Sequence, residues 1–257
     1  MEKQDKRKQY WFVIRELTSR EIKRRYSRSK LGILWSVLSP ILFMSVISLV
    51  FSKMFSKSIE NYPIYYLCGN ILWSLFNNST NSAMTALVDN KNMLIKVKLP
   101  MEIFIVSRVY TAFVNFLYSL IAFVLMLIVF RITPHFTLFF FPVIVLFQMI
   151  FCLGVSYILA TAYVFFGDIK HLYSVMLTLL MYLSALFYPV SSLPDALATV
   201  VSFNPVFVYI DALRNIVMYN TLPTLFSVGK MVVYALVMYL IGFLVFRSNK
   251  NRIMQKI

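Results

Sequence analysis

The sequence alternates between long runs without any charged residue and short segments rich in Lys and Arg. The first such run, residues 31–52, follows a basic segment directly. A helix of about 20 apolar residues, each rising about 1.5 Å, crosses the ~30 Å hydrocarbon core of a membrane. The chain is 60% hydrophobic and 14% charged, whereas soluble domains carry about 25% charged residues. The sequence therefore predicts an all-α integral membrane protein.

We expect six membrane-spanning helices, at residues 31–52, 61–88, 109–130, 141–165, 172–187 and 231–246. The last is short, and we expect a snorkelling Lys230 to extend it backward. The second run ends in the polar cluster NNSTNS, residues 77–82. Exposing its amide and hydroxyl groups to lipid without hydrogen-bond partners would be energetically unfavourable. We therefore expect the cluster to face partner helices or a water-filled path near the cytoplasmic side; the alternative is a solvated loop after a helix that ends near Asn77.

The distribution of positive charge predicts the orientation of these spans. Of the 25 Lys and Arg residues, 20 fall on one side of the membrane in this arrangement. Cytoplasmic loops are enriched in Lys and Arg, so both termini should be cytoplasmic. We expect one transmembrane domain over residues 1–257, with a cytoplasmic N-terminus (1–30), a six-span bundle (31–246) and a cytoplasmic tail (247–257).

The N-terminal segment has the pattern of an amphipathic helix. Apolar residues recur at helical spacing at Tyr10, Val13, Ile14 and Leu17, opposite several charged residues. This pattern, together with Trp11 and Phe12, favours a helix that lies at the cytoplasmic membrane surface. The alternative is a solvated basic leader.

A short mixed stretch, residues 88–104, joins the second and third spans. Met93, Leu94 and Val97 lie at helical spacing within it, between several Lys residues. The stretch is too short to span a membrane and too apolar for a simple loop. It is either a docking surface for another protein or a surface helix packed on lipid.

Prolines interrupt two other apolar segments. Pro134 breaks the start of one long apolar run, so we expect a surface or re-entrant piece at residues 132–140. Between the fifth and sixth spans, Pro189, Pro194 and Pro205 divide the chain into runs too short to cross the membrane. We expect re-entrant or interfacial helices on the outer side there.

Motifs for several other functions are absent from the sequence. It has no GxxxxGK[ST] phosphate loop, no HExxH and no GxSxG. The two cysteines and two histidines are isolated, which gives no metal-binding pattern. The net charge of +15 is explained by membrane topology better than by nucleic-acid binding. A membrane glycan transferase remains an alternative, with Asp168, Asp195 and Asp211 as its candidate carboxylates.

Five short motifs in order resemble a known family. The run RRYSRSKLGILWSVLSP, residues 24–40, is similar to the start of permease subunits of ATP-binding-cassette exporters for lipid-linked polysaccharides of the O-antigen, capsule and teichoic acid type. The further motifs are GNILWSLF (69–76), KLP (98–100), FFGDI (165–169) and FNP (203–205). The likeness covers essentially the whole chain. A drug or lipid exporter of the same transporter class is the nearest alternative.

The resemblance implies how the chain would work. It implies a homodimer in a bacterial cytoplasmic (inner) membrane, with two separate ATPase subunits that hold ATP and Mg²⁺, and no cofactor in this chain. The implied ATPase-coupling residues are Asn92, Met93, Leu94, Ile95 and Lys96 in a main coupling helix, and Gly167, Asp168, Ile169 and Lys170 in a smaller second contact. The two broken helices before the last span would cap the outer mouth.

The polysaccharide path would be lined mainly by the first and fifth spans of both copies. Aromatic faces offer the C–H surfaces of sugars apolar contact, and Tyr hydroxyls exchange hydrogen bonds as a chain slides. Our candidates for the path are Trp35, Phe43, Tyr182 and Tyr188. The alternative for any one of them is an aromatic belt at the membrane interface.

Overall fold

The computed structural model describes residues 2–96 and 99–256, which form helices and connections without a strand. The α-helices are α1 (Glu2–Tyr26), α2 (Leu34–Phe51), α3 (Tyr62–Met84), α4 (Ala86–Asp89), α5 (Lys91–Lys96), α6 (Glu102–Val129), α7 (Phe141–Phe165), α8 (Ile169–Leu183), α9 (Asp195–Phe203), α10 (Pro205–Met218) and α11 (Leu225–Lys256). Two short 3-10 helices are η1 (Phe136–Phe140) and η2 (Val190–Ser192). The expected all-α class is confirmed.

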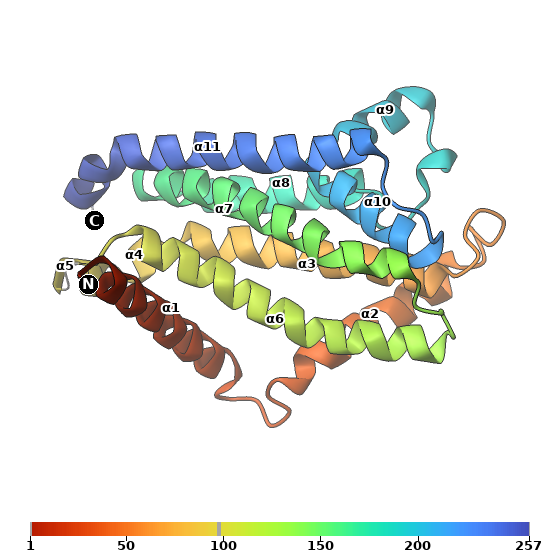
Figure 1. Ribbon diagram of the computed structural model, residues 1–257, viewed down its shortest axis with the longest axis horizontal. Coiled ribbons are helices and arrows are strands. Elements are labelled where there is room, and N and C mark those ends of the chain that lie inside the picture. The colour runs from red at the N-terminus through yellow and green to blue at the C-terminus, as the bar shows by residue number, and fades with distance from the viewer. Residues whose placement is uncertain (1, 97–98, 257) are drawn as a thin grey trace.

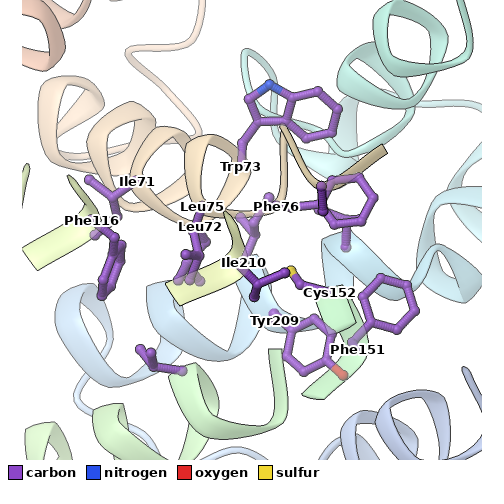
Figure 2. Close-up of a cluster of buried hydrophobic side chains, with 14 of the residues drawn as sticks. Ile71, Leu72, Trp73, Leu75, Phe76, Phe116, Phe151, Cys152, Tyr209 and Ile210 are labelled. Carbon is purple, nitrogen blue, oxygen red and sulfur yellow. The ribbon is translucent and has the colours of Figure 1, made fainter. Parts of the chain in front are cut away.

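The long helices run side by side along the long axis of the molecule (Figure 1). Helix α3 is central and packs against α2, α6, α7 and α10. Figure 2 shows its side chains Leu72, Leu75 and Phe76 among residues of α6, α7 and α10. The N- and C-termini lie at the same end of the bundle as α5, while α9 lies at the opposite end (Figure 1).

Within residues 2–96 and 99–256, four helices are long and apolar enough to cross a membrane: α2, α6, α11, and α7 together with η1. A fifth candidate is the pair α9 and α10, which is bent by 92° at Asn204. Helix α8 is apolar but has only 15 residues. Helix α3 has 23 residues and carries the polar cluster. The bent pair fits a broken span or a re-entrant loop equally.

Several predicted boundaries are confirmed and others are wrong. Helix α7 begins and ends at the predicted residues, and η1 lies within the predicted surface piece. Helix α3 continues to Met84, so the prediction of a loop after Asn77 is wrong. Helix α8 ends at Leu183 instead of residue 187, because Ala185 has a positive φ of 47° that breaks the helix.

The last helix is much longer than predicted. Helix α11 has 32 residues and begins before Lys230, as expected, but it also continues through the basic tail. Ile253 is fully buried in that tail and Lys250 forms an ion pair with Glu102 at 3.1 Å. These contacts stabilise the helical conformation of the polar tail, so the helix continues beyond residue 246, where the predicted span ends.

Helices α7 and α11 pack closely along their length. At the crossing, the backbones of Gly154 and Gly242 touch, and a Cβ atom added to Gly242 would overlap the backbone of Gly154. Small residues at such crossings let helix backbones approach in a membrane, where packing is a main driving force for association. The contact fixes α11 against the rest of the bundle.

Candidate functional site

A cavity of about 480 Å³ lies where α2, α3 and α6 converge with the C-terminal end of α1. Its aromatic lining residues are Tyr26, Trp35, Phe43, Tyr66, Trp73, Phe116 and Phe187. Its polar lining residues are Arg25, Ser36, Ser39, Asn70, Ser74, Asn77, Asn78, Asn115 and Ser119. This lining combines flat apolar faces with amide and hydroxyl groups and contains no carboxylate.

The polar cluster of α3 supplies part of this lining. Asn77 and Asn78 line the cavity, whereas Ser79 and Thr80 are buried against neighbouring helices. Tyr173 of α8 donates a hydrogen bond to Thr80 Oγ1 at 2.6 Å, and Thr80 donates in turn to the Phe76 carbonyl at 2.9 Å. The expectation that the cluster faces partner helices is therefore confirmed for Ser79 and Thr80, while Asn77 and Asn78 face a cavity.

A second, smaller hollow of about 270 Å³ adjoins the cavity. Arg25, Asn78, Ala112 and Asn115 line both hollows. The second hollow also has Glu21, Arg24, Ser82, Arg108 and Thr111 on its walls. Together the two hollows form a groove, which we call the α2–α6 groove, with a basic end and an aromatic end.

Two of the four predicted path residues line this groove. Trp35 and Phe43 lie on its α2 wall. Tyr182 is 55% exposed and lies outside it, although its ring packs at 5.9 Å from the ring of Phe187, which does line it. Tyr188 also lies outside, and its hydroxyl donates to the Tyr182 carbonyl. The structure thus places Trp35 and Phe43 on the same wall of the groove, whereas Tyr182 and Tyr188 lie outside the groove.

The main predicted coupling helix exists as α5, but its exposed face differs from the prediction. Leu94 is only 5% exposed and packs in the core, so the expectation that it forms an exposed docking surface is wrong. Ile95 is 67% exposed, and Asn92 and Lys96 are also exposed. Met93 is half-buried, and Val97 lies outside the described residues. The spacing rule identified a helical face but could not tell its inner side from its outer side.

The second predicted coupling contact is the turn between α7 and α8. Gly167, Asp168 and Lys170 are exposed there, and Ile169 is half-buried. The Asp168 carbonyl accepts hydrogen bonds from His171 and Leu172, which begins α8. Because α6 runs away from α5 and α7 returns, this turn lies at the same end of the bundle as α5 (Figure 1).

A cluster of charges joins α1, α4 and α6 at that end. Arg108 donates to Glu21 at 2.6 Å and to Asp89 at 3.1 Å. Arg20 donates to the side-chain oxygen of Asn90 at 2.6 Å. No local sequence pattern indicates this cluster, because Glu21 and Arg108 are 87 residues apart. The Arg108 side chain is only 11% exposed.

A helical bundle that has several membrane-spanning candidates and a central groove lined by aromatic, amide and basic groups has the layout of a membrane transport subunit. The sequence matches the profile of the ABC-2 type transporter family over residues 13–218, and the chain belongs to this family. It is therefore a multi-pass membrane protein of the permease type.

Comparison with curated proteins gives relatives of similar length. The chain is 33% identical to the O-antigen export system permease protein RfbA of Myxococcus xanthus over 217 residues, 84% of each chain. It is 28% identical to the protein of the same name from Klebsiella pneumoniae over 207 residues, 80% of each. It is 22% identical to the polysialic acid transport protein KpsM of Escherichia coli, over 93% of this chain and 94% of that one.

Proposed function

We propose that this chain is the transmembrane subunit of an ATP-driven exporter that moves a lipid-linked polysaccharide of the O-antigen, capsule or teichoic acid type across the bacterial cytoplasmic membrane. The observation that carries the proposal is the lining of the α2–α6 groove. Aromatic faces and neutral amides suit a sugar chain that must slide without being held tightly. The names of the relatives, which refer to O-antigen export and polysialic acid transport, support the same function.

A substitution in the groove should slow export without stopping ATP hydrolysis. We expect Trp35→Ala to reduce polysaccharide export by roughly tenfold, because losing an aromatic contact worth ~1 to 1.5 kcal/mol corresponds to about that factor. The matched control is Leu42→Ala, also on α2 and exposed, which does not line the groove. Surface polysaccharide and ATPase activity are measured together. Equal export by the two variants would contradict the role of the groove.

We propose six membrane spans, formed by α2, α3, α6, α7, α8 and α11, with both termini in the cytoplasm. An even number of spans agrees with the position of the two termini at one end of the bundle (Figure 1). The 23 residues of α3 would extend ~34 Å, enough to cross the hydrocarbon core. In this arrangement α1 lies at the cytoplasmic interface, where the half-buried or buried face formed by Tyr10, Val13, Ile14 and Leu17 packs against the bundle.

We also propose that two copies of the chain face each other across the polysaccharide path. Helices α2 and α8 support this proposal, because each buries few of its side chains in the single chain. Only Pro40 and Met44 are buried on α2, and only Tyr173 and Leu177 on α8. Exposed apolar residues such as Val46, Leu49 and Leu179 are then available for a second copy or for lipid. Tyr182, exposed on α8, would reach the path from this side.

The proposal includes two copies of an ATP-binding-cassette ATPase, which bind ATP and Mg²⁺ and dock on α5 and on residues 167–170. Ile95 is the exposed apolar side chain of α5. We expect Ile95→Asp to weaken ATPase association at least about tenfold, since replacing an interface anchor costs ~1.4 kcal/mol or more. The control Met254→Asp adds the same charge to an exposed apolar position on α11, outside the proposed docking segments. Copurification of the ATPase is the measurement, and undiminished association of Ile95→Asp would contradict the assignment.

A further inference from the structure

Helix α8 ends in an irregular segment, residues 184–188, that lies inside the protein. Ala185 and Leu186 are at most 1% exposed, and Ala185 has a positive φ of 47°. Leu186 and Phe187 line the α2–α6 groove. The chain then leads to α9, at the end of the bundle opposite the termini (Figure 1). The segment therefore forms part of the groove wall near the outer end.

Side chains from α3 and α10 bind almost every free carbonyl of this irregular segment. The Tyr62 hydroxyl donates to the Phe187 carbonyl and the Tyr65 hydroxyl to the Tyr188 carbonyl, each at 2.8 Å. Asn204 donates to the Leu183 carbonyl at 3.0 Å. Backbone groups in a membrane must find such partners because no water replaces them. The segment is thus held by side-chain hydrogen bonds that can be exchanged, and not by a helix.

Arg214 of α10 is the centre of this arrangement. Its guanidinium donates to the carbonyls of Ala185 at 3.0 Å and Leu186 at 3.3 Å. A third bond goes to the Tyr65 carbonyl at 3.3 Å, and Cζ lies 3.5 Å from the centre of the Tyr65 ring. The carbonyl end of a helix carries partial negative charge, which attracts a cation. One side chain therefore ties α3, α8 and α10 together.

The same arginine is costly to hold in place. It is 2% exposed, and its Nη1 atom has no hydrogen-bond partner. Asp211, one turn earlier on α10, is a nearby carboxylate, but among the described residues no carboxylate forms a direct ion pair with Arg214. A buried cation without a directly paired counter-ion is unfavourable unless polar groups surround it. The guanidinium is stabilised here by the carbonyls of residues 185 and 186. If the segment moved away from Arg214, the guanidinium and these carbonyls would lose their hydrogen bonds to each other.

Gly69 provides the space for this contact. A Cβ atom at position 69 would lie 2.8 Å from a Leu186 methyl carbon and 3.0 Å from Arg214 Nη2. Only a residue without a side chain fits there unless the segment moves. Gly69 begins the GNILWSLF motif and Asn204 lies in the FNP motif, and both are explained by contacts with the end of α8.

We propose that Arg214 is a positioning residue that latches residues 184–188 across the outer end of the α2–α6 groove, and that this latch opens during export. The inference rests on the proposed function for the direction of transport. The contact joins three helices through a small number of directional hydrogen bonds. When these bonds are formed the groove wall is closed, and when they are broken the segment can move and the wall is open.

The test measures access to the groove from the outer side. Ser74 lines the groove, and Ser74→Cys provides a reporter thiol for sulfonatoethyl methanethiosulfonate, a membrane-impermeant reagent, added outside spheroplasts that contain the complete transporter. The native Cys68 and Cys152 are both fully buried, so their background labelling should be low. We expect Arg214→Met to raise the labelling rate about tenfold or more, because it removes charge-assisted hydrogen bonds that favour the closed wall. Arg214→Lys, which keeps the charge, should show partial rescue.

Lys230→Met is the matched control, because it removes another positive charge near the outer end, where Lys230 lies over the rings of Phe203 and Phe226. Its labelling rate should equal that of the parent. If Arg214→Met does not fold, Gly69→Ala tests the same contact by displacing Leu186 and the guanidinium. Unchanged labelling in whichever folded variant is obtained would overturn the latch. Export of polysaccharide is assayed in parallel: a parent that exports none would refute the proposed function, while the labelling result would still decide the latch.

Discussion

Replacing Gly242 by Leu should prevent the protein from reaching its folded state in the membrane. The backbones of α7 and α11 are in contact at Gly154 and Gly242, so there is no space for a side chain. Overpacking in a well-packed core costs about 1–3 kcal/mol even where flexible side chains can move, and here the obstacle is backbone. The two helices would have to separate, which removes the packing that holds α11. We expect loss of monodisperse protein after detergent extraction, and a lower unfolding temperature for Gly242→Ala.

The matched control is Gly229→Ala in the same helix. A Cβ atom at Gly229 meets nothing within 4 Å, and alanine has a better helix propensity than glycine by about 1 kcal/mol. Gly229→Ala should therefore be neutral or slightly stabilising. An unfolding temperature for Gly242→Ala that equals or exceeds that of Gly229→Ala would show that the α7–α11 crossing is not as close as described.

The second large effect is expected at the charge cluster of α1, α4 and α6. Arg108→Met removes the closest ion-pair partner of the Glu21 carboxylate, whose side chain is 11% exposed, and leaves it only the longer contact with Arg20 at 3.5 Å. Breaking a buried pair from one side costs up to about 3–5 kcal/mol. We expect a corresponding loss in the free energy of unfolding in detergent, together with release of α1 from α6, measured as faster proteolysis near residue 20.

The ion pair between Lys250 and Glu102 provides the comparison, because the Lys250 side chain is 43% exposed. Lys250→Met should cost about 0–1 kcal/mol, as exposed pairs contribute little. Removing both partners of the buried pair, in Glu21→Leu with Arg108→Met, should recover part of the stability lost in Arg108→Met alone, because the charges that then lose a partner, Asp89 and Arg20, have side chains that are 39% and 50% exposed. A double variant that is less stable than Arg108→Met would contradict this explanation.

The sequence predicted those parts of the fold that depend on local pattern. Charge-free length placed α2, α6 and α7, and the periodicity of Tyr10, Val13, Ile14 and Leu17 identified the packed face of α1. Prolines located the bend between α9 and α10. Each of these features is determined by neighbouring residues, so it can be read without knowledge of the tertiary structure.

Features that depend on distant contacts could not be predicted in the same way. The end of α11 is set by Ile253 and by the pairing of Lys250 with Glu102, and the early end of α8 by partners on α3 and α10. The same reason explains Leu94: helical spacing gives the residues of one face, but only the packed structure tells which face is inside.

The residues of the candidate site also divide into those indicated by local sequence pattern and those brought together by distant contacts. Trp35 and Phe43 could be proposed because the first span was recognised and both are aromatic. The basic end of the groove could not be predicted from the sequence, because its residues Arg24, Ser82 and Arg108 come from three different helices. Arg214 lies in the outer segment between the fifth and sixth predicted spans, and no local pattern in the sequence indicates that its side chain is buried.

The most direct test of the account is to delete this gene in its host and measure polysaccharide on the cell surface and inside the cell. The account predicts loss from the surface and accumulation inside. Wild-type chain should restore export only together with an ATPase partner that can hydrolyse ATP, and Ile95→Asp should fail to restore it. Normal surface polysaccharide in the deletion strain, or export that persists with an inactive ATPase, would contradict the account.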